Sequence, residues 1–152
     1  MPKVQASLNA TFLATVYQGE LGRDLDATGV SYWGTLLSQT GDRTQVAAGI
    51  LSSTEYLNKE VWTDYGTLLG RAPDASGWFT FVHALRDGAT PQDVQATILG
   101  SNEFYARVGG NTLDYLDALY HDVLNRPVDD DGVIHWAPLA GSEAGRANCP
   151  RH

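Results

Sequence analysis

The sequence predicts an all-α fold in which tandem helical repeats pack into one compact bundle, with the third repeat incomplete. Three observations carry this prediction: a nine-residue phrase recurs three times, apolar residues follow helical spacing between its copies, and no useful stretch alternates between apolar and polar residues. The copies of the phrase occupy residues 21–29, 69–77 and 124–132. Their arginines, at positions 23, 71 and 126, are 48 and 55 residues apart, which suits units of several helices.

Helix-start and helix-stop signals place the elements of each repeat. A helix over 8–21 precedes the first phrase, Asp26 is placed to cap the next helix, and Asp42 opens a short third one. Residues 52–55 read as a capping box that opens a helix leading into the second phrase, which fuses one repeat to the next. In the second repeat, the glycines at 109–110 break the corresponding helix.

The expected organisation is a single domain over residues 1–152. The repeats span about 8–55, 56–110 and 111–140, and residues 141–152, rich in Gly, Ser and Ala, form a flexible tail. The third copy lacks the Ser-x-Glu-aromatic phrase that ends the other two, at Ser53 and Ser101.

Composition excludes several functional classes. The net charge of −8 and the isoelectric point near 4.7 argue against nucleic-acid binding, which needs clustered Lys and Arg. No apolar run approaches the roughly 20 residues that cross a bilayer, so no membrane insertion is expected. The single cysteine, Cys149, excludes an internal disulfide framework and a cysteine-based metal site.

Catalytic and metal-binding motifs are weak, so the chain is predicted not to be an enzyme. The four histidines lack metal-ligand spacing, and neither a Gly-x-Ser-x-Gly elbow nor a phosphate-binding loop occurs. Asp24, Asp26 and Gly29 match the first half of an EF-hand loop, but its twelfth position is Thr35 instead of Glu. No cofactor is expected. A looser calcium site at residues 129–131 stays open beside the interpretation of this acidic run as a solvated turn.

The recurring phrase Leu-Gly-Arg-x-x-Asp-x-x-Gly-x-x-x-Trp, beside Ser-x-Glu-Tyr, resembles the DUF4214 family over roughly residues 8–136. Those domains are small and helical and often occur in tandem in large secreted or surface-attached bacterial proteins. The phrase is also similar to the linker domains of phycobilisomes, which organise other proteins. The resemblance implies an extracellular setting and a binding role toward carbohydrate, but supplies no site residues. The chain departs from the family pattern at Leu25 and Val128, where Pro is usual, and at Asn125, where Gly is usual.

The phrase itself admits two interpretations. Its arginines and aspartates are either ligands for sugar hydroxyls or a helix cap with its charge partner, and their presence in all copies favours the cap. The glycines that end the phrase then permit close helix packing. The aromatics four residues later, Trp33, Phe81 and Trp136, interchange as core positions do.

Residues that break the repeat are the better functional candidates. Trp62 replaces Ala14 and Asp117, and Trp78 replaces the valines of the other copies. Exposed aromatic rings are platforms for sugar rings, whereas the alternative places either tryptophan in a groove between repeats. His135, in the place of Tyr32, is a third departure.

We therefore expect a non-catalytic, lectin-like carbohydrate-binding module of a secreted or cell-surface bacterial protein, with a glycan or monosaccharide as its partner. The alternative is a protein-interaction or assembly module, such as a linker or adhesin, in which the tryptophans anchor another protein module. The predicted carbohydrate-binding residues are Arg71, Asp74, Trp78, Trp62, Asp26, Asp129, Asp131 and His135.

Overall fold

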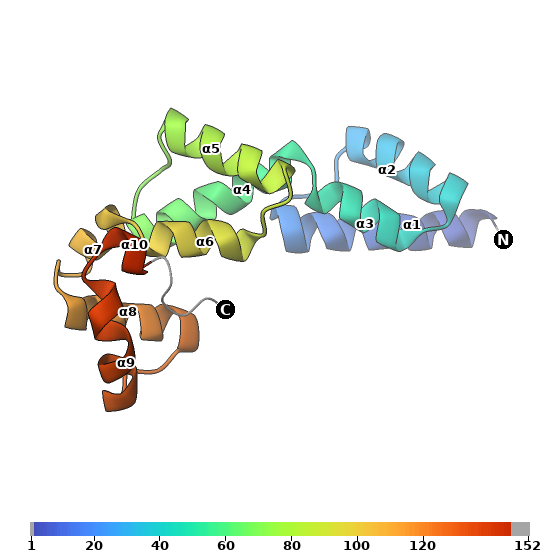
Figure 1. Ribbon diagram of the computed structural model, residues 1–152. Helices are drawn as coiled ribbons and strands as arrows, with labels where there is room; N and C mark the ends of the chain where they lie inside the picture. Colours follow the sequence, from blue (N-terminus) through green and yellow to red (C-terminus); the bar gives the residue numbers. More distant parts are fainter. Residues whose placement is uncertain (1, 147–152) are drawn as a thin grey trace. The chain divides into compact units, whose positions relative to one another are not determined.

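The computed structural model describes residues 2–146, and the regular elements in this range are all helices (Figure 1). In chain order they are α1 (Pro2–Val16), η1 (Tyr17–Leu21), α2 (Ala27–Thr40), α3 (Arg43–Leu51), α4 (Thr54–Asp64), η2 (Tyr65–Leu69), α5 (Ala75–Arg86), α6 (Pro91–Leu99), α7 (Asn102–Arg107), α8 (Thr112–Leu124), α9 (Asp130–Ala140) and α10 (Glu143–Arg146). The predicted all-α class is confirmed. Contacts divide the chain into two compact units, and the boundary after Lys59 falls inside α4.

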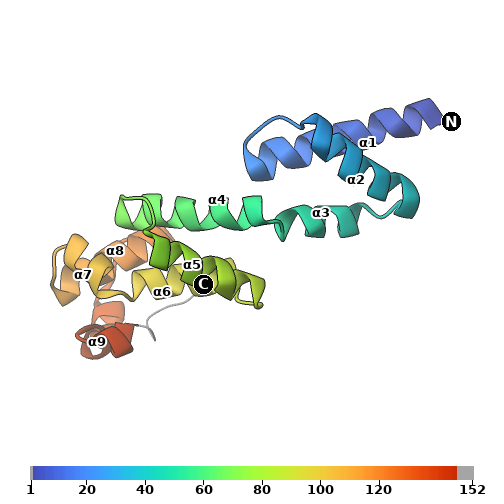
Figure 2. The ribbon, with the colours of Figure 1, turned by 90° about the horizontal axis from the view of Figure 1, so that it is seen from above.

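The first unit contains the first repeat. Helix α2 packs against both α1 and α3 (Figure 2). The apolar core between these helices consists of Leu13, Tyr17, Leu37, Val46 and Ile50. The predicted core residue Trp33 is half-buried and packs against this cluster. Burial of this one apolar face, repeated at helical spacing, is what holds the three helices together.

The second unit contains the second and third repeats. Helix α5 packs on α6, α8 packs on α9, and α7 contacts η2. The largest fully buried side chains here are those of Phe104 and Tyr115, whose rings meet edge to face at 6.1 Å between centroids. Phe81 and Trp136, also predicted as core, are half-buried.

A π-helical turn closes the first helix of the first two repeats. In η1 the N–H of Gly22 donates to the carbonyl of Tyr17, and in η2 the N–H of Gly70 donates to the carbonyl of Tyr65. Both glycines are left-handed, with φ of 68° and 65°, a conformation that a side chain disfavours. The third repeat differs because α8 stays α-helical and ends at Asn125, whose φ is 53°.

Most of the predicted helix caps are confirmed. Side chains of Asp26, Asp42 and Asp74 each accept a hydrogen bond from a main-chain N–H three residues later. The capping box predicted at residues 52–55 is wrong in its details. The cap of α4 is Ser53, whose hydroxyl accepts from the N–H of Tyr56, and Glu55 binds elsewhere.

Helix α4 continues directly into η2, as the predicted fusion of the first two repeats requires. The predicted break at residues 109–110 is also present, where Gly109 and Gly110 have φ of 129° and 69° and separate α7 from α8. No helix in the described part of the chain is both long enough and apolar enough to cross a membrane.

Part of the predicted tail is folded. Residues Glu143–Arg146 form α10, and the buried Arg146 guanidinium donates to the carbonyls of Gly100 and Ala140. It also lies 4.3 Å from the ring centroid of Tyr105. Local composition did not predict this, because two of the stabilising partners, Gly100 and Tyr105, lie far away in sequence. Cys149 lies outside the described residues.

Candidate functional site

The thrice-repeated phrase builds the same corner three times. In each copy the tyrosine at the end of the first helix lies between the arginine and the glycine of the phrase. The guanidinium carbons of Arg23, Arg71 and Arg126 lie 4.8, 5.0 and 4.9 Å from the ring centroids of Tyr17, Tyr65 and Tyr120. A methyl group on Gly29, Gly77 or Gly132 would collide with the hydroxyl of the same tyrosine. The predicted close helix packing at these glycines is confirmed.

The aspartate of the phrase caps the helix that follows it. Its Oδ1 accepts from the glycine N–H at 2.7, 2.7 and 2.8 Å in Asp26, Asp74 and Asp129. In the first and third copies the arginine also pairs with this carboxylate, at 3.0 Å for Arg23–Asp26 and 2.8 Å for Arg126–Asp129. The structural interpretation of the phrase is therefore correct.

A second carboxylate joins the corner in two copies. Glu55 accepts from Arg23 through both oxygens, at 2.5 Å from Nε and 2.9 Å from Nη2. Glu103 accepts from Arg71 in the same way, at 2.6 and 2.8 Å. Sequence reasoning missed both pairs by assigning Glu55 to a cap. The available signal was the separation of 32 residues between arginine and glutamate in both copies.

Hydrogen bonds within the corners lower the pKa of Asp26, Glu55, Glu103 and Asp129. The Arg23 guanidinium lowers the pKa of Glu55, and Arg71 does the same for Glu103. The main-chain N–H of Gly132, with Arg126 in support, lowers the pKa of Asp129. These groups are consequently charged at neutral pH and bound to partners within the protein.

The remaining predicted residues lie on three helices. Trp62 on α4 is 54% exposed, and Trp78 on α5 is half-buried one turn after the Asp74 cap. Asp131 is exposed in the first turn of α9. His135 is exposed farther along α9, and its ring meets that of Trp136 edge to face at 4.5 Å. Tyr32 contacts Trp33 in the same manner at 4.7 Å, so the two repeats share this aromatic pair.

The acidic turn at residues 129–131 has one of its three carboxylates engaged. Asp129 binds the N–H of Gly132 and the Arg126 guanidinium. Across residues 2–146, no group of three or more His, Cys, Asp or Glu side chains is arranged to hold a metal ion. Within that range, the acidic turn therefore has no such cluster of ligand side chains around it.

A shallow groove follows one face of α2 in the first repeat. This α2 groove has a volume of about 640 Å³ and begins immediately after the Asp26 cap. Its lining residues are Ala27, Thr28, Ser31, Tyr32, Thr35, Leu36 and Gln39. The lining combines hydroxyl groups, one amide and the exposed ring of Tyr32, which is 64% accessible.

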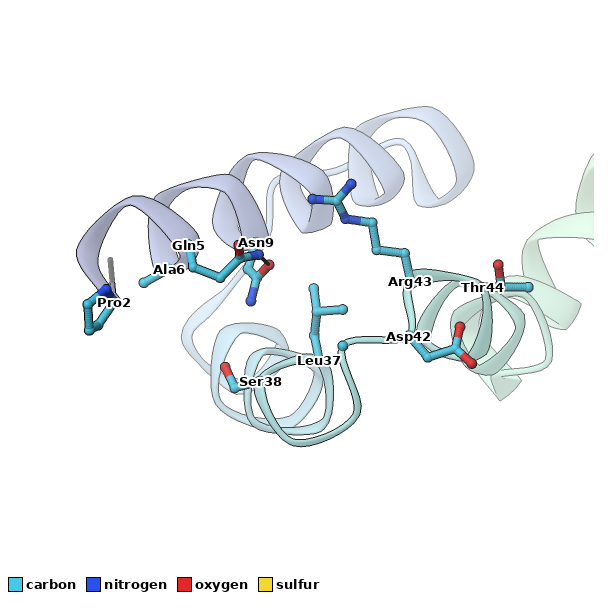
Figure 3. Close-up of a pocket in the computed structure, with 10 residues that line it drawn as sticks. Pro2, Gln5, Ala6, Asn9, Leu37, Ser38, Asp42, Arg43 and Thr44 are labelled. Atoms are coloured by element: carbon cyan, nitrogen blue, oxygen red, sulfur yellow. Dashed lines mark hydrogen bonds between the residues drawn. The ribbon is translucent and has the colours of Figure 1, made fainter.

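A second hollow, the N-terminal pocket, lies between α1 and the turn joining α2 to α3 (Figure 3). Its volume is about 760 Å³, and its lining contains no aromatic side chain. The buried Asn9 receives a hydrogen bond from Gln5 at 2.9 Å, while Arg43 extends toward α1. None of the eight residues predicted as a carbohydrate site lines either hollow.

The α2 groove was missed because helix periodicity does not show where the surface is hollowed. The available signal was Tyr32 itself, which occupies the repeat position of the predicted site residue His135.

Comparison with known families gives one match. The sequence model of a family described as a domain of unknown function, DUF4214, matches residues 3–60 and 95–149. Neither a curated protein nor a solved structure matches the chain.

Proposed function

The chain belongs to the DUF4214 family, and from that premise we propose that it is a non-catalytic carbohydrate-binding module of a secreted or cell-surface bacterial protein. The observation that carries the proposal is the α2 groove, in which the exposed Tyr32 ring lies among hydroxyl and amide groups. Aromatic faces pack against the apolar face of a sugar ring, and neighbouring polar groups bind its hydroxyls.

The chemistry of the groove suits a neutral sugar. Thr28, Ser31 and Thr35 offer hydroxyls that both donate and accept, and the Gln39 amide adds two donors and an acceptor. No charged side chain lines the groove, so nothing in it favours an ionic ligand. Its volume lies within the roughly 300–1,000 Å³ typical of small-molecule sites.

The other two repeats supply aromatic side chains at related positions. Trp78 follows the Asp74 cap on α5. On α9, His135 occupies the repeat position that Tyr32 has on α2. We include Trp78, His135 and the exposed Trp62 as aromatic platforms of further glycan sites in the second unit, separate from the α2 groove. The other predicted candidates are the corner residues Asp26, Arg71, Asp74 and Asp129, and Asp131 in the first turn of α9. The side chains of Asp26, Arg71, Asp74 and Asp129 are already engaged in caps and ion pairs, so the aromatic rings carry the expected affinity.

A glycan array probed with the labelled chain tests the proposal. Tyr32→Ala should weaken the signal for the bound glycan about tenfold or more, whereas Tyr32→Phe, which keeps the ring, should retain most of it. Val30→Ala is the matched control, because Val30 is exposed on the same helix but does not line the groove. Trp78→Ala probes the second repeat in the same assay.

The absence of any bound glycan would overturn the function. A glycan that binds the Tyr32→Ala and Trp78→Ala variants as well as the parent would overturn the proposed site. Thermal melting of each variant shows that the fold is intact before its binding is compared.

A second candidate function is a protein-interaction or assembly module. The supporting observation is that Phe79 and Ile134, at equivalent positions on α5 and α9, are 57% and 75% exposed. Exposed apolar side chains of this size are typical of interaction surfaces when they form a patch. Light scattering should then show a mass that rises with concentration and falls in a Phe79→Ser/Ile134→Ser double variant. A constant monomer mass up to millimolar concentration would remove self-assembly through these two side chains.

A further inference from the structure

The third corner lacks the ion pair that completes the other two. Arg126 has the same position over Tyr120 as its counterparts have over their tyrosines, and it binds its own cap Asp129. Among the described residues, however, no glutamate binds Arg126. Its side chain is 48% exposed, against 37% for Arg23 and 39% for Arg71.

A second contact of the complete corners is also missing. Four residues after the glutamate, Lys59 donates to the carbonyl of Glu20 at 2.5 Å, and Arg107 donates to the carbonyl of Leu69 at 2.8 Å. Lys59 therefore lies at the carboxyl end of η1, and Arg107 lies at the carboxyl end of η2. The helix dipole favours positive charge at both places. Within residues 2–146, no side chain makes this contact at the end of α8.

The third repeat also differs from the second in the exposure of an apolar side chain at the end of its first helix. Leu69, at the end of the first helix of the second repeat, is 7% exposed. Leu124 occupies the equivalent position in the third repeat and is 36% exposed. The surface that α7 approaches at η2 in the second repeat is thus more exposed at Leu124 in the third.

From these differences we infer that the open corner, formed by Arg126, Leu124 and the last turn of α8, is a docking site for the start of another repeat-type helix. The occupant is a helix that begins Ser-x-Glu-aromatic and carries Lys or Arg four residues after the glutamate. Its carboxylate binds the Arg126 guanidinium through two oxygens, and its cation binds the last carbonyls of α8. This inference uses different residues from the glycan proposal and stands without it.

The chain contains a suitable probe for this site. A peptide of residues 52–69 carries the cap Ser53, Glu55 and Lys59 in one helical segment. The test is an NMR titration of the full ¹⁵N-labelled chain with this unlabelled peptide up to millimolar concentration. Shifts are expected at the amides of 121–132 and at the Nε–H of Arg126, but not at Arg23 or Arg71, whose glutamates are already in place.

Matched variants separate specific docking from general adhesion. A Glu55→Gln peptide should bind about fivefold more weakly, which is the upper range for an exposed ion pair with two hydrogen bonds. Arg126→Gln in the chain should remove the dependence on Glu55, and Arg86→Gln, an exposed arginine on α5, should not. The inference is overturned by unchanged amides at 121–132, or by equal binding of the parent and Glu55→Gln peptides.

Discussion

The hydroxyl of Tyr17 lies against the α-carbon of Gly29, on the first turn of α2, so that a methyl group there would approach the hydroxyl oxygen to 2.5 Å. The same side of the residue faces Leu25, whose Cδ1 would be 2.8 Å from that methyl group. Tyrosine and glycine therefore set how closely the first two helices of the repeat approach. The relationship recurs in the other two copies.

Gly29→Ala is expected to destabilise the first unit by about 1–3 kcal/mol, because the added methyl group overpacks the corner. Gly34→Ala, on the same helix, is the matched control. Nothing lies within 4 Å of the added group at Gly34, and alanine favours the helix by up to about 1 kcal/mol. Urea unfolding of both variants checks this, and equal stabilities would contradict the packing at Gly29.

Asp74→Ala should lower stability by about 1 kcal/mol, since α5 loses the acceptor for the Gly77 N–H. Asp74→Asn should keep most of that stability, because asparagine caps helices about as well as aspartate. Thermal melting distinguishes the two variants. A structural cap requires this difference, and an equal loss in both variants would show that the negative charge matters more than the hydrogen bond.

The stability of the second unit should fall in acid through Glu103. Its pKa lies below the ordinary value of 4.5 because Arg71 donates to the carboxylate. A lowered carboxyl pKa contributes stability that is fully present above pH 4.5 and is lost as the pH falls through the lowered value. Glu103→Gln should give a shallower decrease of the unfolding free energy below pH 4.5, and Arg71→Gln should have the same effect. The prediction is contradicted if the unfolding free energy of both variants falls with decreasing pH as steeply as that of the parent.

The contribution of Asp64 to folding stability has the opposite pH dependence. It is buried and accepts from the Gln95 amide at 3.0 Å, and burial raises its pKa above the ordinary 3.8. The stability linked to this raised pKa is present below pH 3.8 and is lost as the pH rises through the raised value. Asp64→Asn, which keeps an acceptor for Gln95, should therefore raise the melting temperature by a few degrees at pH 7 and have no effect below pH 3.8. A lower melting temperature at pH 7 would contradict this prediction.

Arg146→Met should destabilise the second unit by about 2–3 kcal/mol, because the carbonyls of Gly100 and Ala140 lose a charged donor. The long apolar methionine side chain retains much of the packing on Tyr105. Lys3→Met, at an exposed position on α1, is the control and should change stability by less than about 0.5 kcal/mol. Chemical denaturation measures both, and an effect of similar size at the two positions would mean that α10 does not stabilise the unit.

The repeat corner shows how far sequence patterns extend. The caps at Asp26 and Asp74 were predictable because a cap joins residues only three positions apart. The ion pair of Arg23 with Glu55 was not predicted, since it forms only when the chain folds back across 32 residues. The α2 groove was missed for a different reason: its lining residues all lie on α2, and helical spacing alone does not show which face of a helix is left exposed and hollowed.

The sequence by itself determined the helical class, the three copies of the repeat and the caps that start its helices, because these depend on local spacing and short-range hydrogen bonds. Only the tertiary structure decided which side chains remain exposed and able to bind a ligand or partner. It engages Arg23 and Arg71 with distant glutamates, buries Arg146 against the carbonyl of Gly100 and the ring of Tyr105, and leaves Tyr32 and Arg126 exposed. Availability depends on which surfaces other helices cover, and that is a property of the packed molecule.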